Sequence, residues 1–146
     1  MKILVINGVN MNMLGFREPE KYGCMTLKNL EDELKNFAVS VNIILDTWQS
    51  NIEGEIVEKI HASQNIYDGI VLNAGAYTHT SVAIRDAISA VCAKVVEIHM
   101  TNIYAREDFR HTSLIAPVCI GQISGFGIES YKLGIKAVAD YLASSK

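Results

Sequence analysis

Short apolar runs separated by helical spacing constrain the fold of this chain more than any other feature. Residues 3–6 (Ile-Leu-Val-Ile) form an uninterrupted apolar run that stops at Asn7-Gly8. Such a run, bounded by turn residues, is typical of a strand that is buried on both faces of a sheet. Comparable runs lie at residues 41–45, 70–72, 95–98 and 118–123. The sequence therefore predicts five buried strands.

Helical spacing occupies the segments between these runs. Leu27, Leu30 and Leu34 fall on one helical stripe, and Thr26 precedes it where an N-cap residue is expected. Residues 50–53 (Ser-Asn-Ile-Glu) have the spacing of a capping box. Further stripes lie at residues 52–60, 80–91 and 131–142. Strands that alternate with helices predict a doubly wound α/β fold in three layers, with a five-stranded parallel sheet and helices on both faces.

Composition and charge narrow the class of protein. The 146 residues match about one domain, so we expect a single domain over residues 1–146. The formal net charge of −3 disfavours a nucleic-acid partner or a polybasic contact with a membrane. The apolar runs are too short for a signal peptide or a membrane span. The hydrophobic share of 49% is high for a domain that buries only about 70% of its unfolded surface, so we expect part of the apolar surface to contact a partner subunit.

The cysteines and histidines show no pattern of a metal site. Cys24, Cys92 and Cys119 have neither CxxC nor metal-ligand spacing, which fits reduced thiols in a cytoplasmic protein. The four histidines show no HExxH or paired spacing, so we expect no metal. The chain also lacks GxGxxG, P-loop and GxSxG motifs. We therefore expect no cofactor, and any chemistry must come from side chains alone.

Polar residues stand where three of the predicted strands end. Asn7 and Asn10 follow the first strand, Asn73 ends the third, and Glu97 and His99 lie in the fourth. Ligands of open parallel sheets bind beyond the carboxyl ends of the strands. Alternation along a strand places Glu97 and His99 on the same side. These two residues form either a structural hydrogen-bonded pair or an acid–base pair of an active site.

Two long segments without periodicity carry further candidates. Residues 15–23 have glycines at both ends, as a hinged lid would, and include Arg17 and Tyr22. The alternative is a solvated loop in which Arg17 pairs with a neighbouring acid. Residues 100–116 contain Arg106, Arg110 and His111 as candidate ligands for anions or hydroxyls.

The segment after the third strand is rich in hydrogen-bonding side chains. Residues 73–81 read Asn-Ala-Gly-Ala-Tyr-Thr-His-Thr-Ser, and Arg85-Asp86 follow in the predicted helix. An N-cap for that helix explains one of the hydroxyl residues in this segment. It does not explain His79, which we retain as a candidate site residue.

Together these motifs resemble type II 3-dehydroquinate dehydratase. The resemblance runs from about residue 3 to residue 142 and rests on residues 8–23, 49–54, 73–81, 97–99 and 102–110. It implies a flavodoxin-like fold and a lyase that removes water from 3-dehydroquinate to give 3-dehydroshikimate in the shikimate pathway, which leads to chorismate and aromatic amino acids. It further implies that no metal or organic cofactor is needed, and that trimers assemble into a dodecamer.

The resemblance also assigns catalytic roles. It implies that Tyr22 is the base that removes the proton alpha to the ketone, with Arg17 beside it on a lid at about residues 15–25. His99 would be the general acid that protonates the departing hydroxyl. Asn10 would help to hold a water that stabilises the enolate, and Glu97 would orient the catalytic groups.

The substrate contacts follow from the same resemblance. Asn73 and the backbone of Met100 and Thr101 would bind the substrate carboxylate, while His79 and Arg110 would contact ring hydroxyls. The resemblance places Arg106 in the same vicinity and lets Asp86 reach the site of a neighbouring subunit. The family usually has proline at the position of Val9 and commonly serine at that of Thr101. Neither departure alters a predicted catalytic residue.

Two other classes of protein remain open from the residues themselves. A flavodoxin-like module that holds a flavin or a phosphorylated aspartate predicts a yellow protein or an acidic cluster at the strand ends. The predicted strand ends carry Asn10, Asn73 and His99, with Glu97 as their one acid. A structural assembly subunit explains the apolar surplus but leaves Arg17 without a role.

Overall fold

The sheet of the protein is the one that the apolar runs predict. The computed structural model describes residues 1–16 and 18–145, with Lys21 and Tyr22 described by their backbone alone. Five strands pair in the order β2-β1-β3-β4-β5, and every pairing is parallel. The strands are β1 (Lys2–Asn7), β2 (Ile44–Gln49), β3 (Gly69–Asn73), β4 (Lys94–His99) and β5 (Gly121–Ser124).

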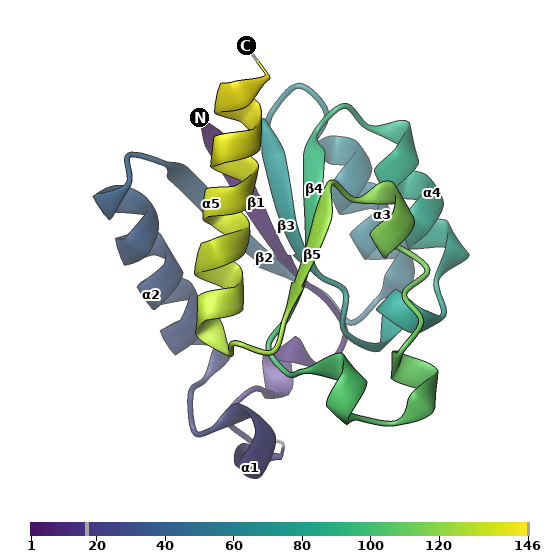
Figure 1. Cartoon of the computed structure of the whole chain (residues 1–146). Helices are drawn as coiled ribbons and strands as arrows, with labels where there is room; N and C mark the ends of the chain where they lie inside the picture. The colour runs from purple at the N-terminus through teal and green to yellow at the C-terminus, as the bar shows by residue number, and fades with distance from the viewer. Residues whose placement is uncertain (17, 146) are drawn as a thin grey trace.

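Helices cover both faces of this sheet, which confirms the expected three-layer α/β fold. The α-helices are α1 (Pro19–Tyr22), α2 (Leu27–Ser40), α3 (Glu53–Ala62), α4 (Val82–Ala90) and α5 (Ile128–Ser144). Figure 1 shows α2 and α5 on one face and α3 and α4 on the other. None of the helices in the described part of the chain combines the length and apolarity needed to cross a bilayer.

Alternation along the strands divides the core into two halves. Ile3 and Val5 of β1 face α2 and α5, where they belong to the same buried cluster as Leu34. Leu4 and Ile6 face the other way, into the cluster that α3 and α4 contribute. All four of these β1 side chains are fully buried. A strand buried on both faces must be apolar at every position, which is why β1 reads as a continuous apolar run.

The two edge strands lie further along the chain than predicted. The second strand is predicted at residues 41–45, whereas β2 begins at Ile44 because α2 continues to Ser40 and Asn42 turns the chain with a φ of 58°. The fifth is predicted at residues 118–123, whereas β5 begins at Gly121 after a 3-10 turn over Ala116–Val118. An edge strand has solvent along one side, so polar residues are tolerated in it and the apolar run no longer marks its ends.

The predicted helix starts are correct in one case and need revision in the other. Thr26 caps α2, as expected, and the structure adds a reciprocal capping box with Asn29. At the start of α3, Ser50 Oγ accepts the N–H of Ile52 at 3.0 Å and donates to Glu55. The capping-box spacing predicts Glu53 as the partner of Ser50. The structure differs because the N-cap of α3 is Ile52, two residues after Ser50.

Candidate active site

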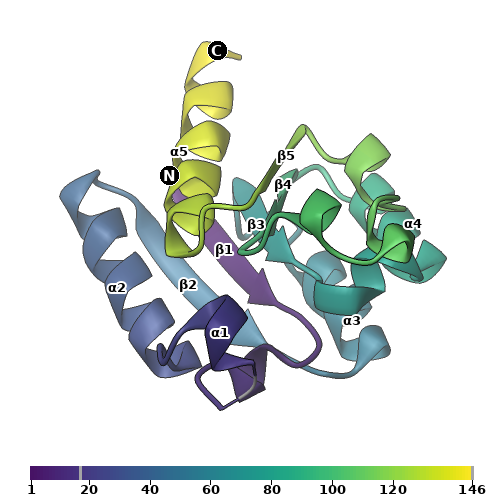
Figure 2. The same ribbon diagram turned by 60° about the horizontal axis from the view of Figure 1, so that its bottom comes forward.

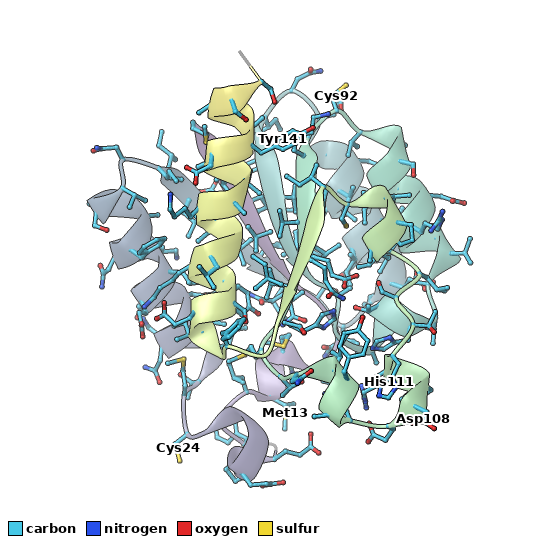
Figure 3. The ribbon with its side chains drawn as sticks, in the orientation of Figure 1. Met13, Cys24, Cys92, Asp108, His111 and Tyr141 are labelled. Atoms are coloured by element: carbon cyan, nitrogen blue, oxygen red, sulfur yellow. The ribbon has the colours of Figure 1, made fainter. Side chains whose placement is uncertain are left out.

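The polar strand ends meet in one pocket at the carboxyl edge of the sheet. Figure 2 shows that α1 and the turns that follow β4 gather at this edge. In Figure 3 Met13, a lining residue, and His111 lie at this end of the molecule, whereas Cys92 and Tyr141 lie at the other. Of the predicted site residues, the pocket is lined by Asn10, Asn73, His79, His99, Met100, Thr101, Arg106 and Arg110.

Close backbone packing between two loops brings the first and third strand ends together. The N–H of Gly8 donates to the carbonyl of Asn73 at 2.7 Å. A Cβ at Gly8 would lie 2.6 Å from the carbonyl oxygen of Ala74, so any larger side chain would push the loops apart. Gly75 has a φ of +61° and a similar approach to the carbonyl of Val9. Asn10 and Asn73 therefore reach the same pocket.

Glu97 and His99 form the buried ionisable pair of the site. The Glu97 side chain has no exposed surface, and its Oε2 lies 3.1 Å from Nε2 of His99. Gln122 Nε2 donates to the same oxygen at 2.6 Å, and Ser113 donates to Oε1. Burial raises the pKa of Glu97, but the hydrogen bonds from His99, Ser113 and Gln122 outweigh it and leave that pKa below its usual value. Glu97 is therefore a carboxylate at neutral pH.

His79 occupies a different electrostatic environment beside His99. The two imidazole rings stack with their centroids 6.2 Å apart. Burial lowers the pKa of His79, and the neighbouring His99 and Arg110 act in the same direction. Because Nδ1 of the neutral ring lies 2.8 Å from the carbonyl oxygen of Thr112, it carries the proton and donates. Nε2 of His79 is then an acceptor suited to a hydroxyl.

Asn73 is oriented by Tyr131, a buried residue that the sequence predicts only as part of the helical stripe at residues 131–142. Asn73 Nδ2 donates to the hydroxyl of Tyr131 at 2.9 Å, and Asn73 Oδ1 accepts the N–H of Gly75 at 3.2 Å. The Tyr131 hydroxyl in turn donates to Oδ1 of Asn7 at 2.5 Å. Tyr131 and Asn7 are fully buried, and Asn73 is nearly so. A tyrosine at a core position of a helix indicates a buried polar contact, because a buried hydroxyl requires a hydrogen-bond partner.

Replacing Tyr131 with phenylalanine is expected to lower the free energy of unfolding by about 1–3 kcal/mol. The change removes one oxygen and leaves buried polar atoms of Asn7 and Asn73 without their partner. Urea denaturation measures the effect. Tyr141→Phe is the matched control, since Tyr141 is 42% exposed on the same helix and its loss should cost less than about 0.5 kcal/mol. Equal stabilities of the two variants would contradict the prediction.

Two arginines give the pocket a cationic side. Arg106 donates to Oγ1 of Thr101 at 3.3 Å, and Arg110 donates through Nε to Glu107 at 2.5 Å. The hydrogen bond from Arg110 is the main reason why the pKa of Glu107 falls to about 2. Both arginine side chains are largely buried, with exposed fractions of 12% for Arg106 and 16% for Arg110. Such a lining suits an anionic ligand.

The remaining predicted residues stand apart from this cluster or outside the described part of the chain. Asp86 is exposed on α4 and does not line the pocket. Arg17 lies outside the described residues, and so does the side chain of Tyr22, whose backbone ends α1. Within the described residues no group of His, Cys, Asp or Glu is arranged to hold a metal ion.

Comparison with known proteins identifies the family. The family model described as Dehydroquinase class II matches residues 1–139. The chain belongs to this family. It is 56% identical over 140 residues to 3-dehydroquinate dehydratase of Trichodesmium erythraeum, covering 96% of this chain and 93% of the relative. The corresponding dehydratase of Synechocystis is 52% identical over 141 residues, covering 97% and 93%.

Solved structures of similar proteins share the fold. The crystal structure of type II dehydroquinase from Butyrivibrio crossotus superimposes with a TM-score of 0.93 at 47% identity, covering 95% of this chain and 97% of that one. A 3-dehydroquinate dehydratase-like protein from Bifidobacterium longum is more distant, with a TM-score of 0.73 at 26% identity and 98% of each chain covered.

Proposed function

We propose that this protein dehydrates 3-dehydroquinate to 3-dehydroshikimate in the shikimate pathway, without a metal or an organic cofactor. The observation that carries the proposal is the buried Glu97–His99 pair at the edge of a pocket that also holds Asn73 and Arg110. Membership of the dehydroquinase family supports the same reaction. The comparisons favour this lyase over a flavin-binding or signalling module of similar fold.

The first step of the proposed reaction is removal of the proton alpha to the ketone by Tyr22. A tyrosine has an ordinary pKa of about 10 and must be ionised to act as a base at neutral pH. Lowering that pKa by about 3 requires about 4 kcal/mol of preference for the phenolate. A guanidinium within about 4–6 Å lowers a pKa by about 1–3, and Arg17 is the proposed source. Asn10 would hold the water that stabilises the resulting enolate.

The second step is loss of the beta hydroxyl, which needs a proton donor. His99 can act as that donor only when its imidazole is protonated. The Glu97 carboxylate, 3.1 Å from Nε2 of His99, would fix the orientation of the ring. A donor on the opposite side of the substrate ring from Tyr22 produces anti elimination.

The rest of the pocket would bind and orient the substrate. We assign its carboxylate to Asn73 and to the backbone of Met100 and Thr101, which line the pocket directly after β4. The acceptor nitrogen of His79 and the guanidinium of Arg110 would contact ring hydroxyls. Arg106 would add positive charge in the same vicinity.

Assembly and cellular location complete the proposal. We propose that residues 1–146 form one catalytic domain with a lid at about residues 15–25, working in the cytoplasm as a dodecamer built from four trimers. Asp86 would then reach the site of a neighbouring subunit. Val82, one helical turn before it, is apolar and 57% exposed, as expected of a surface that another copy covers.

The activity assay is direct. Incubation with 3-dehydroquinate should raise the ultraviolet absorbance, because the product contains a conjugated enone carboxylate. The rise should persist after treatment with a metal chelator. No rise with folded protein would overturn the proposed reaction, whereas a rise that a chelator abolishes would overturn its independence of metal. Light scattering tests the dodecamer, and a mass of one chain would contradict it.

A further inference from the structure

Glu97 makes more hydrogen bonds than its pairing with His99 requires. Its carboxylate receives donors from three segments of the chain: His99 on β4, Ser113 in the segment before β5, and Gln122 on β5. His99 and Gln122 share Oε2, and Ser113 takes Oε1. A fully buried carboxylate without such donors would bind a proton instead of remaining charged.

The direction of the Ser113 hydrogen bond follows from its second partner. The N–H of Ala116 donates to Oγ of Ser113 at 2.9 Å. Since that bond uses a lone pair of the hydroxyl oxygen, the hydroxyl proton is left to point at Oε1 of Glu97. Ser113 is therefore oriented as a donor by the backbone of the 3-10 turn that follows it.

Strand register places Gln122 opposite Glu97. The two residues are paired across β4 and β5, so the side-chain amide spans the short distance between neighbouring strands. Nε2 of Gln122 donates to Oε2 at 2.6 Å, the same oxygen that faces Nε2 of His99. Gln122 thus restrains the carboxylate oxygen on which the orientation of the imidazole depends.

We infer that Ser113 and Gln122 are positioning residues, which hold the Glu97 carboxylate charged and aligned so that His99 can deliver its proton. The inference rests on the proposed dehydration. Neither residue is among those that line the pocket, so we expect neither to contact the substrate directly. Their action on the reaction passes through Glu97, in the way that outer hydrogen bonds tune an acid–base pair.

The other charged or titratable groups around the pair do not replace these donors. In the described part of the chain they are His79, Arg106 and Arg110 of the pocket and Cys119, with Arg85 bound to the backbone beside Ser113. Arg85 of α4 donates to the carbonyl of Leu114 at 2.7 Å, and Arg110 is held by Glu107. Burial and the nearby Glu97 charge raise the pKa of Cys119 to about 12, so its thiol stays neutral. Ser113 and Gln122 are therefore the residues to substitute in a test of the positioning role.

The test compares the pH dependence of kcat for the wild type, Ser113→Ala and Gln122→Leu. Removing a donor disfavours the carboxylate, so Glu97 should stay protonated to higher pH. Ionisation of Tyr22 sets the first acid limb of the profile. A second limb at lower pH, where Glu97 binds a proton, is expected to move up by about one pH unit in each variant. KM should change by less than about twofold, because substrate contacts are retained. Gln122→Glu, which has the same shape but adds a second carboxylate, should move the limb further.

Matched controls separate positioning from general destabilisation. Ser113→Thr keeps the hydroxyl and should restore the wild-type profile. Gln64→Leu removes a comparable amide, whose Oε1 accepts the N–H of Cys92 away from the site, and Ser89→Ala removes an exposed hydroxyl of α4. Neither control should move the second acid limb. If Ser113→Ala fails to fold, the two Gln122 variants still decide the question.

A measurement without turnover distinguishes failure of this inference from failure of the proposed function. The carboxyl carbon of Glu97 can be titrated by 13C nuclear magnetic resonance, and its midpoint should rise by about one pH unit in Gln122→Leu. An unchanged midpoint together with an unchanged profile would overturn the positioning role. If the wild type has no dehydratase activity but the Glu97 midpoint still differs between the wild type and Gln122→Leu, the proposed reaction is overturned. The hydrogen-bond assignment is then kept.

Discussion

Replacing His99 with glutamine is expected to lower kcat by about 10²–10⁴-fold, the usual contribution of a general acid. Glutamine can still hydrogen-bond to Glu97 but has no proton to deliver to the departing hydroxyl. The position is 6% exposed, so water has limited access to take over the role. Turnover is measured by the absorbance of the product, and KM should stay within about threefold because the substrate contacts remain.

Solvent exchange shows which step His99→Gln has lost. If Tyr22 still removes the alpha proton, substrate recovered from deuterated water should carry deuterium at that carbon even though elimination is slow. His61→Gln is the matched control, since His61 is exposed on α3 and should leave both exchange and turnover unchanged. Elimination at the wild-type rate in His99→Gln would reassign the general acid.

Replacing Tyr22 with phenylalanine should remove turnover to a similar extent, about 10²–10⁴-fold in kcat, because it eliminates the proposed base. The ring is retained and only the ionisable oxygen is lost, so substrate binding should be largely intact. In contrast to His99→Gln, this variant should also lose the exchange of the alpha proton into solvent. The pair of variants therefore assigns one residue to each step.

The control for Tyr22→Phe is Tyr141→Phe, at the end of the molecule opposite to Met13 of the pocket (Figure 3). That variant should retain wild-type kcat and wild-type exchange. A Tyr22→Phe enzyme with nearly full activity would show that another group is the base. Retained exchange without turnover would place Tyr22 in the elimination step instead.

How well a strand could be predicted depended on where it lies in the sheet. The three inner strands, β1, β3 and β4, match their predicted apolar runs to within one residue at each end. Both edge strands begin three residues later than predicted. Inner strands are buried on both faces and must be apolar throughout, whereas edge strands are selected by pairing along one side only.

The site shows the same division between local and distant information. Glu97 and His99 lie two residues apart, so alternation along one strand sufficed to predict their meeting. Gln122 is 25 residues from Glu97, and Tyr131 is 58 residues from Asn73. No periodicity links positions so far apart. Their roles became visible only when β5 and α5 were placed beside β4 and β3.

The sequence by itself determined the layered α/β fold, the edge of the sheet where the polar strand ends gather, and the family resemblance that names the reaction. These properties follow from local spacing, because the pattern of apolar residues records which faces of each element are buried. Only the tertiary structure decided which side chains hold Glu97 charged and Asn73 oriented. Hydrogen bonds between buried groups depend on the packing of elements that the chain brings together from far apart, and that packing has no local signature.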